Sequence, residues 1–109
     1  KSLLLKVENN FLICLVAGDK RCSLNKLKNI LKKSDISMAS AAEVKNKTGF
    51  SIGGVSPVGH INKLDVLVDN SLKRFANVFA AGGHPNCIFK ISYKDLMKIT
   101  NGIEENISE

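Results

Sequence analysis

The chain has 109 residues, of which 44% are hydrophobic, so it is long enough to bury one core and form a single domain. This composition excludes a disordered segment, and no apolar run approaches the roughly 18 residues that cross a membrane. The net charge is +6, and the excess lies wholly in residues 1–48, which carry ten Lys and Arg against four Asp and Glu. Such asymmetry favours an anionic partner, with nucleic acid as the first candidate, although a solvated lysine-rich face fits as well.

The first third of the chain predicts a hairpin and a helix. Two apolar runs at residues 2–7 and 11–17 flank three polar residues, which is typical of a β-hairpin. Ser23 then suits a helix N-cap, and leucines recur at helical spacing at positions 24, 27 and 31. The lysines of this segment lie mostly outside the helix face that these leucines define. We therefore expect an outer basic face, which fits phosphate contact and ordinary solvation about equally.

The next segment predicts a short helix followed by a glycine-rich loop. Ser40 and Glu43 form a capping-box pattern for a helix through about Lys47, and Gly49 suits its C-terminal end. Residues 48–60 then hold four glycines and one proline. Clustered glycines indicate close backbone approach or positive φ angles, and such a loop can present several N–H groups to an oxygen-rich ligand. A tight loop between two strands explains the pattern about as well.

The second half predicts three strands and two short helical segments. Strands are expected at residues 64–68, 77–81 and 87–91, and Asp69 is placed to cap a helical turn that runs through Phe75. The last two strands flank a second glycine loop at 82–86. Ser92 and Asp95 form a further capping pattern for a final helix, and we expect the tail at 104–109 to be frayed.

The order of these elements predicts an α+β fold. Strands outnumber helices, and the regular β-α-β alternation of a doubly wound sheet is absent. We therefore expect one domain over residues 1–109, built as a curved, barrel-like mixed β-sheet with about three short helices. Both glycine-rich loops are expected at strand ends.

Several common catalytic motifs do not fit the sequence. Gly54 and Gly59 have the spacing of a phosphate-binding P-loop, but His60 stands where that motif needs lysine. No dinucleotide fingerprint and no G-x-S-x-G motif occurs. The three cysteines form no C-x-x-C pair, which favours a reducing, cytoplasmic setting. Neither His60 nor His84 has a carboxylate or cysteine at ligand spacing, so we expect no metal and no cofactor.

A resemblance to a known family gives these patterns a more specific meaning. Residues 44–59, with the core Thr-Gly-x-x-x-Gly-Gly-x-Ser-Pro-x-Gly, resemble the signature of the YbaK/EbsC family. The segments at 67–72 and 79–86 and the opening Lys-Ser-Leu-Leu are similar too, and the resemblance extends from residue 1 to about 102. This family comprises aminoacyl-tRNA deacylases related to the editing domain inserted in bacterial prolyl-tRNA synthetases.

The resemblance implies an activity and its partners. The expected reaction is hydrolysis, in trans, of the ester between a small wrong amino acid and tRNA, usually tRNA for proline. The implied partners are aminoacyl-tRNA and a prolyl-tRNA synthetase, in the cytoplasm and without a membrane. Because an aminoacyl ester is already activated, a positioned water or ribose hydroxyl and a stabilised oxyanion are sufficient for its hydrolysis.

The resemblance also assigns roles to individual residues. Catalytic roles fall on the matched lysine, which orients the 3′ end of the substrate, and on the loop that holds the aminoacyl group: Lys1, Gly53, Gly54, Ser56 and Pro57. Substrate-binding roles fall on Gly59, Asp69, Gly82, Gly83 and His84. Capping of the next turn explains Asp69 equally well. The acceptor stem of the tRNA is expected to contact Lys20, Arg21, Lys26 and Lys28.

Two alternatives stay open at this point. Family members normally carry a helix and a strand before the matched lysine, so we expect a domain that lacks these elements. Together with the basic first half, this departure motivates a second interpretation, a catalytically silent module that binds tRNA or a synthetase. A small-molecule or nucleotide-binding domain is the third interpretation.

Overall fold

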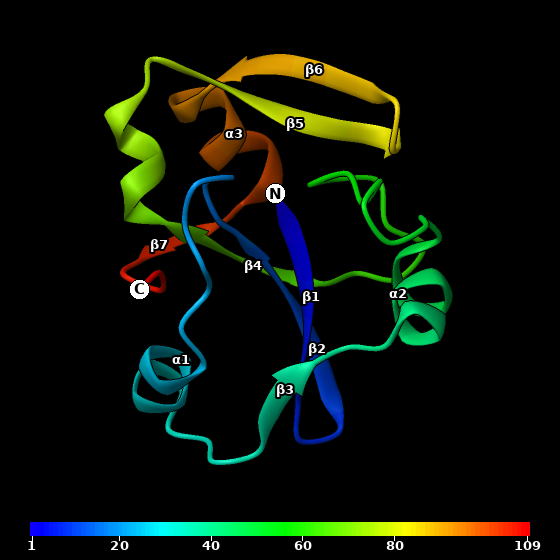
Figure 1. Ribbon diagram of the computed structural model, residues 1–109, viewed down its shortest axis with the longest axis vertical. Helices are drawn as coiled ribbons and strands as arrows, with labels where there is room; N and C mark the ends of the chain where they lie inside the picture. Colours follow the sequence, from blue (N-terminus) through cyan, green and yellow to red (C-terminus); the bar gives the residue numbers. More distant parts are fainter.

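The architecture is a mixed sheet with a separate ribbon above one end (Figure 1). It was obtained as a computed structural model that describes residues 1–109. The elements in chain order are β1 (Ser2–Val7), β2 (Asn10–Leu15), α1 (Leu24–Leu31), β3 (Ile36–Met38), α2 (Ala41–Thr48), β4 (Asp65–Asp69), a 3₁₀ helix (Asn70–Arg74), β5 (Asn77–His84), β6 (Cys87–Ser92), α3 (Tyr93–Thr100) and β7 (Ile103–Glu105). None of the helices has the length and hydropathy needed to cross a lipid bilayer.

The predicted α+β class, with a mixed sheet and three short α-helices, is confirmed. Five strands form one sheet in the order β3-β1-β2-β4-β7, while β5 and β6 pair only with each other. Strand β1 runs antiparallel to β2 and β3, whereas β2–β4 and β4–β7 are parallel pairs. The sheet remains open and does not close into a barrel.

The sheet has one apolar cluster on each face, because successive side chains of a strand point to opposite sides. The larger core contains 12 buried residues, including Leu15, Leu72, Val78 and Leu96. The smaller core contains 8 and includes Leu27 of α1. Helix α1 therefore covers one face, while α2, α3, the glycine-rich loop and the β5–β6 ribbon cover the other.

Local capping fixes the helix boundaries that the sequence predicts. Ser23 accepts a hydrogen bond from the Lys26 N–H at 3.2 Å and begins α1. Ser40 and Glu43 form the complete capping box of α2, and Gly49 ends this helix at φ +84°. Ser92 likewise begins α3. Each cap satisfies backbone groups that a helix end would otherwise leave without a partner.

The prediction of a frayed C-terminal tail is wrong. Strand β7 extends the sheet beside β4, and Ile107 is fully buried in the smaller core. The reason is long-range: the Asp69 carboxylate accepts the N–H groups of Ile107 at 2.9 Å and Ser108 at 3.0 Å. The sequence did not predict the short strand β3 either, which also depends on a long-range contact, its pairing with β1.

Candidate functional site

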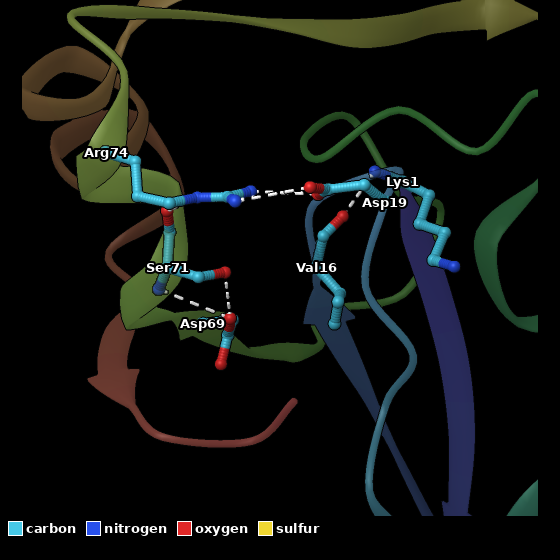
Figure 2. Close-up of polar contacts among 6 residues, drawn as sticks. All are labelled: Lys1, Val16, Asp19, Asp69, Ser71 and Arg74. Atoms are coloured by element: carbon cyan, nitrogen blue, oxygen red, sulfur yellow. Dashed lines mark hydrogen bonds and ion pairs between the residues drawn. The ribbon is translucent and has the colours of Figure 1, made fainter. Parts of the chain in front are cut away.

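Lys1 lies at the end of the sheet over which the β5–β6 ribbon passes (Figure 1). Its backbone is fixed against β2, since the Lys1 nitrogen donates to the Val16 carbonyl at 2.7 Å and the Val16 N–H donates to the Lys1 carbonyl at 3.0 Å. Its side chain is exposed and points away from Asp19 (Figure 2). The Nζ atom has no hydrogen bond or ion pair within the protein, so this ammonium is available to a ligand.

Two cavities share the wall that contains Lys1. The larger cavity has a volume of about 380 Å³ and the smaller one about 30 Å³. Residues common to both are Lys1, Leu72, Val78 and Phe79. The larger cavity adds Ala17, Gly18, Asp19, Phe75 and Asn77, and the smaller one adds Ser2, Leu15, Pro57, Ala80 and Leu96. The smaller cavity is therefore mainly apolar, with a polar edge at Lys1 and Ser2.

An ion pair ties two walls of the larger cavity together. The Arg74 guanidinium donates to both oxygens of the Asp19 carboxylate, at 2.8 and 3.2 Å (Figure 2). Hydrogen bonding to Arg74 lowers the pKa of Asp19 below its ordinary value. The guanidinium also lies 4.7 Å from the centre of the Phe75 ring. This bidentate geometry holds the turn after β2 against the 3₁₀ helix.

The glycine-rich loop reaches the site mainly through Pro57, which is fully buried and lines the smaller cavity. Ser56 is also buried, and its hydroxyl accepts the Val58 N–H at 3.3 Å, which braces the loop. Gly53 adopts φ +84°. A Cβ at Gly54 would lie only 2.8 Å from the Pro85 nitrogen, so the loop packs directly on the tip of the ribbon.

The structure does not bring every predicted loop residue to the Lys1 cavities. Of the predicted catalytic residues, Lys1 and Pro57 line them, whereas Gly53, Gly54 and Ser56 line neither cavity. Gly59 lines a separate surface hollow that begins at Pro57.

The second glycine segment belongs to strand β5 and not to a loop. Gly82, Gly83 and His84 continue this strand through an irregularity in its pairing with β6. Gly83 has φ +96° and lies against the Phe50 ring, while the exposed His84 ring accepts the Asn86 N–H at 3.1 Å. None of the three lines the Lys1 cavities.

Residues earlier in β5, and not Gly82–His84, form the wall of the cavities that the sequence analysis assigned to the glycine segment. Val78, Phe79 and Ala80 line the cavities, and sequence reasoning missed all three. The available signal was the predicted strand itself, which leads directly into Gly82. Which of its residues meet Lys1 depends on how the ribbon docks on the sheet.

Asp69 is fully buried and is used entirely within the fold. Its carboxylate caps the 3₁₀ helix by accepting hydrogen bonds from the backbone and hydroxyl of Ser71 (Figure 2). It also accepts hydrogen bonds from the backbone of the tail. Burial opposes ionisation, but the hydrogen bonds from Ser71 and Ile107 outweigh it and lower the pKa of Asp69 below its ordinary value. The geometry matches the capping interpretation of this residue.

None of the predicted tRNA-contacting residues lines the Lys1 cavities. Lys20 and Arg21 directly follow Gly18 and Asp19, which line the larger cavity. Lys26 and Lys28 belong to α1, which packs on the opposite face. The Lys26 ammonium also donates to Asn106 at 3.1 Å and to the Ser108 carbonyl at 2.5 Å, so it anchors the tail.

The cysteines lie outside this site. Cys14 is buried in the smaller core, and a hydrogen bond with Cys22, together with burial, raises the pKa of its thiol. A thiol of this kind stays protonated and unreactive. Cys87 is exposed on β6, and no cysteine lines either of the Lys1 cavities.

Comparison with known proteins identifies the class of domain that carries this site. Residues 1–99 match the model of the aminoacyl-tRNA editing domain. The chain belongs to this family, which confirms the resemblance found in the signature of the glycine-rich loop.

Individual relatives agree with the family. A proline–tRNA ligase from Caldicellulosiruptor bescii is 37% identical over 84 residues, which cover 77% of this chain and 14% of the ligase. The corresponding ligase from Bacillus licheniformis is 38% identical over the same shares of both chains. The chain thus spans about one seventh of the length of these relatives.

A solved structure extends the similarity to the whole fold. The crystal structure of a candidate trans-editing enzyme for prolyl-tRNA synthetase superposes with a TM-score of 0.95 at 35% identity. The match covers 100% of this chain and 69% of that chain. The open mixed sheet and the separate ribbon are therefore the fold of an editing domain.

Proposed function

We propose that this domain is an aminoacyl-tRNA deacylase that acts in trans on tRNA for proline charged with a small wrong amino acid. Two observations carry the proposal: Lys1 lines both a small apolar cavity and a larger open one, and its ammonium has no partner within the protein. Membership of the editing-domain family and the similarity to proline–tRNA ligases support the same conclusion.

The junction suits an aminoacyl ester. The side chain of the amino acid enters the smaller cavity, the ribose lies in the larger one, and the ester carbonyl lies between them near Lys1. Attack by water, which the neighbouring ribose hydroxyl can position, on the carbonyl carbon places negative charge on the carbonyl oxygen, which the Lys1 ammonium stabilises. The carbon–oxygen bond to the ribose then breaks, and the ribose oxygen takes up a proton.

The rigid surroundings of Lys1 matter for this chemistry. Its backbone is locked to Val16 on both sides, and Pro57 is packed behind the smaller cavity without exposure. A carbonyl held in one orientation reacts faster because little orientational freedom remains to be lost in the transition state.

The smaller cavity favours alanine among the candidate amino acids. A volume of about 30 Å³ admits only a very small side chain. Its apolar walls accept a methyl group, whereas a hydroxymethyl group loses hydration on entering. Each additional methylene changes discrimination by about 1–3 kcal/mol, so larger side chains are disfavoured stepwise.

The test is a panel of charged tRNAs. We would charge tRNA for proline with alanine, serine, cysteine or proline and follow loss of the ester in the presence of the purified chain. Rapid loss of alanine, with prolyl-tRNA left intact, is expected. Binding of tRNA without hydrolysis of any ester would instead support the silent binding module.

A further inference from the structure

We propose that Phe79, assisted by Phe75, is a stacking platform for the adenine base at the 3′ end of the bound tRNA; this inference rests on the function proposed above. Both phenylalanines line the larger cavity beside Lys1. Phe79 is 65% exposed and Phe75 is 47% exposed. Large aromatic rings that line a concave surface and remain open to solvent are available to a planar ligand.

The sizes of the two cavities separate the parts of the substrate. The larger one, at about 380 Å³, falls in the range of small-molecule sites of about 300–1,000 Å³. The smaller one has room only for a small side chain. Since the ester joins the amino acid to the ribose of the terminal adenosine, a side chain in the smaller cavity places this nucleoside in the larger cavity.

Phe79 is the residue best placed for contact with that nucleoside. It lines both cavities, so it lies beside the junction where the ester is expected, whereas Phe75 lines only the larger one. The Arg74 guanidinium lies 4.7 Å from the centre of the Phe75 ring and is fixed by Asp19. The guanidinium covers one face of the Phe75 ring and itself offers a flat cationic surface on which a base can stack.

Asn77 supplies a polar group in the same cavity. A carboxamide presents one donor and one acceptor, which pair with N7 and N6 of adenine in a bidentate contact. Stacking on phenylalanine alone accepts any base, because every base has a π face. Asn77 therefore gives the platform a preference for adenine.

The test uses an acceptor-stem minihelix in which 2-aminopurine replaces the terminal adenine. The fluorescence of this base falls when it stacks on an aromatic ring, so binding to the wild-type chain is expected to quench it saturably. Phe79→Leu is expected to remove most of the quenching and to weaken binding about tenfold. Phe79→Tyr keeps a ring at this position and is expected to retain both.

A matched control lies on the same ribbon. Ile88 is 66% exposed, nearly the same as Phe79, but it lines neither cavity. Ile88→Leu is therefore expected to quench like the wild type. Thermal unfolding of all variants shows whether the fold is intact. Because Phe79 is exposed, its substitution is expected to leave the unfolding temperature unchanged.

The quenching assay needs no hydrolysis, so it separates this inference from the proposed function. If quenching depends on Phe79 but the chain has no deacylase activity, the stacking role of Phe79 is supported and only the proposed enzymatic function is refuted. Deacylation of alanyl-tRNA with an unchanged KM in Phe79→Leu, or quenching that persists in that variant, would overturn the platform.

Discussion

Lys1 and Asp69 are both charged, and both lie in segments that resemble the editing-domain signature, yet their surroundings differ (Figure 2). Asp69 is fully buried and accepts hydrogen bonds from Ser71, Ile107 and Ser108. Lys1 is exposed and lines two cavities, and its ammonium has no partner in the protein.

The comparison shows that two charged residues in segments that both match the family signature can have different roles in the protein. A buried carboxylate is stable only when its lone pairs are satisfied, and satisfying them with backbone N–H groups connects distant parts of the chain. An exposed ammonium is solvated at little cost until a ligand displaces the water. Asp69 thus stabilises the fold, whereas the Lys1 ammonium is available to a ligand.

The largest effect on stability is expected when the Asp69 carboxylate is removed. Asp69→Ala removes the acceptor of two buried N–H groups in the tail, and we expect a loss of about 3 kcal/mol in the free energy of unfolding. Asp65→Ala, on the exposed first residue of the same strand, is the matched control and is expected to be nearly neutral. Chemical denaturation measures both. Equal stability of the two variants would contradict the structural role of Asp69.

A smaller effect is expected from the contact between the glycine-rich loop and the ribbon. Gly54→Ala places a methyl group 2.8 Å from the Pro85 backbone, and we expect it to cost about 2 kcal/mol as the loop shifts. Gly18→Ala is the control, because a Cβ there meets no atom within 4 Å. If both variants unfold at the same denaturant concentration, the loop does not pack on the ribbon.

The role of the smaller cavity beside Lys1 can be tested by reducing its volume. Ala80→Val adds two methyl groups to its wall, and we expect kcat/KM for alanyl-tRNA to fall about tenfold while stability changes little. The measurement is the rate of deacylation together with a thermal unfolding curve. An unchanged rate would show that the amino acid does not enter this cavity.

The pH dependence of stability gives a further, smaller test of the Asp69 region. Because hydrogen bonds lower the pKa of Asp69 in the folded state, its contribution to stability is fully present above the unfolded pKa of about 3.9. It is lost as the pH falls through the lower, folded pKa. The unfolding free energy of the wild type should therefore drop more steeply in acid than that of Asp69→Asn. Parallel pH profiles would exclude this linkage.

Local signals in the sequence were sufficient for most of the fold. The caps at Ser23, Ser40 and Ser92 depend on side chains within three residues of the groups they bind, so the helices could be located from the sequence alone. The two apolar runs at the start likewise defined the first hairpin.

Long-range contacts account for what could not be predicted. The tail is ordered because β7 pairs with β4 and because Asp69 binds Ile107 across 38 residues, and no local pattern marks either contact. The site was only partly predicted for the same reason. Lys1 and Pro57 came from the signature, but Val78, Phe79 and Ala80 reach them through the docking of the ribbon on the sheet.

The central claim, that the unpaired Lys1 ammonium acts on the ester, is tested most directly by single-turnover deacylation of alanyl-tRNA for proline. We compare the wild type, Lys1→Ala and Lys94→Ala, an exposed lysine on α3 as the control. Lys1→Ala is expected to be slower by about 100-fold at saturating enzyme with an unchanged unfolding curve, because a charge that stabilises the transition state is lost. A Lys1→Ala variant that deacylates as fast as Lys94→Ala would contradict the account.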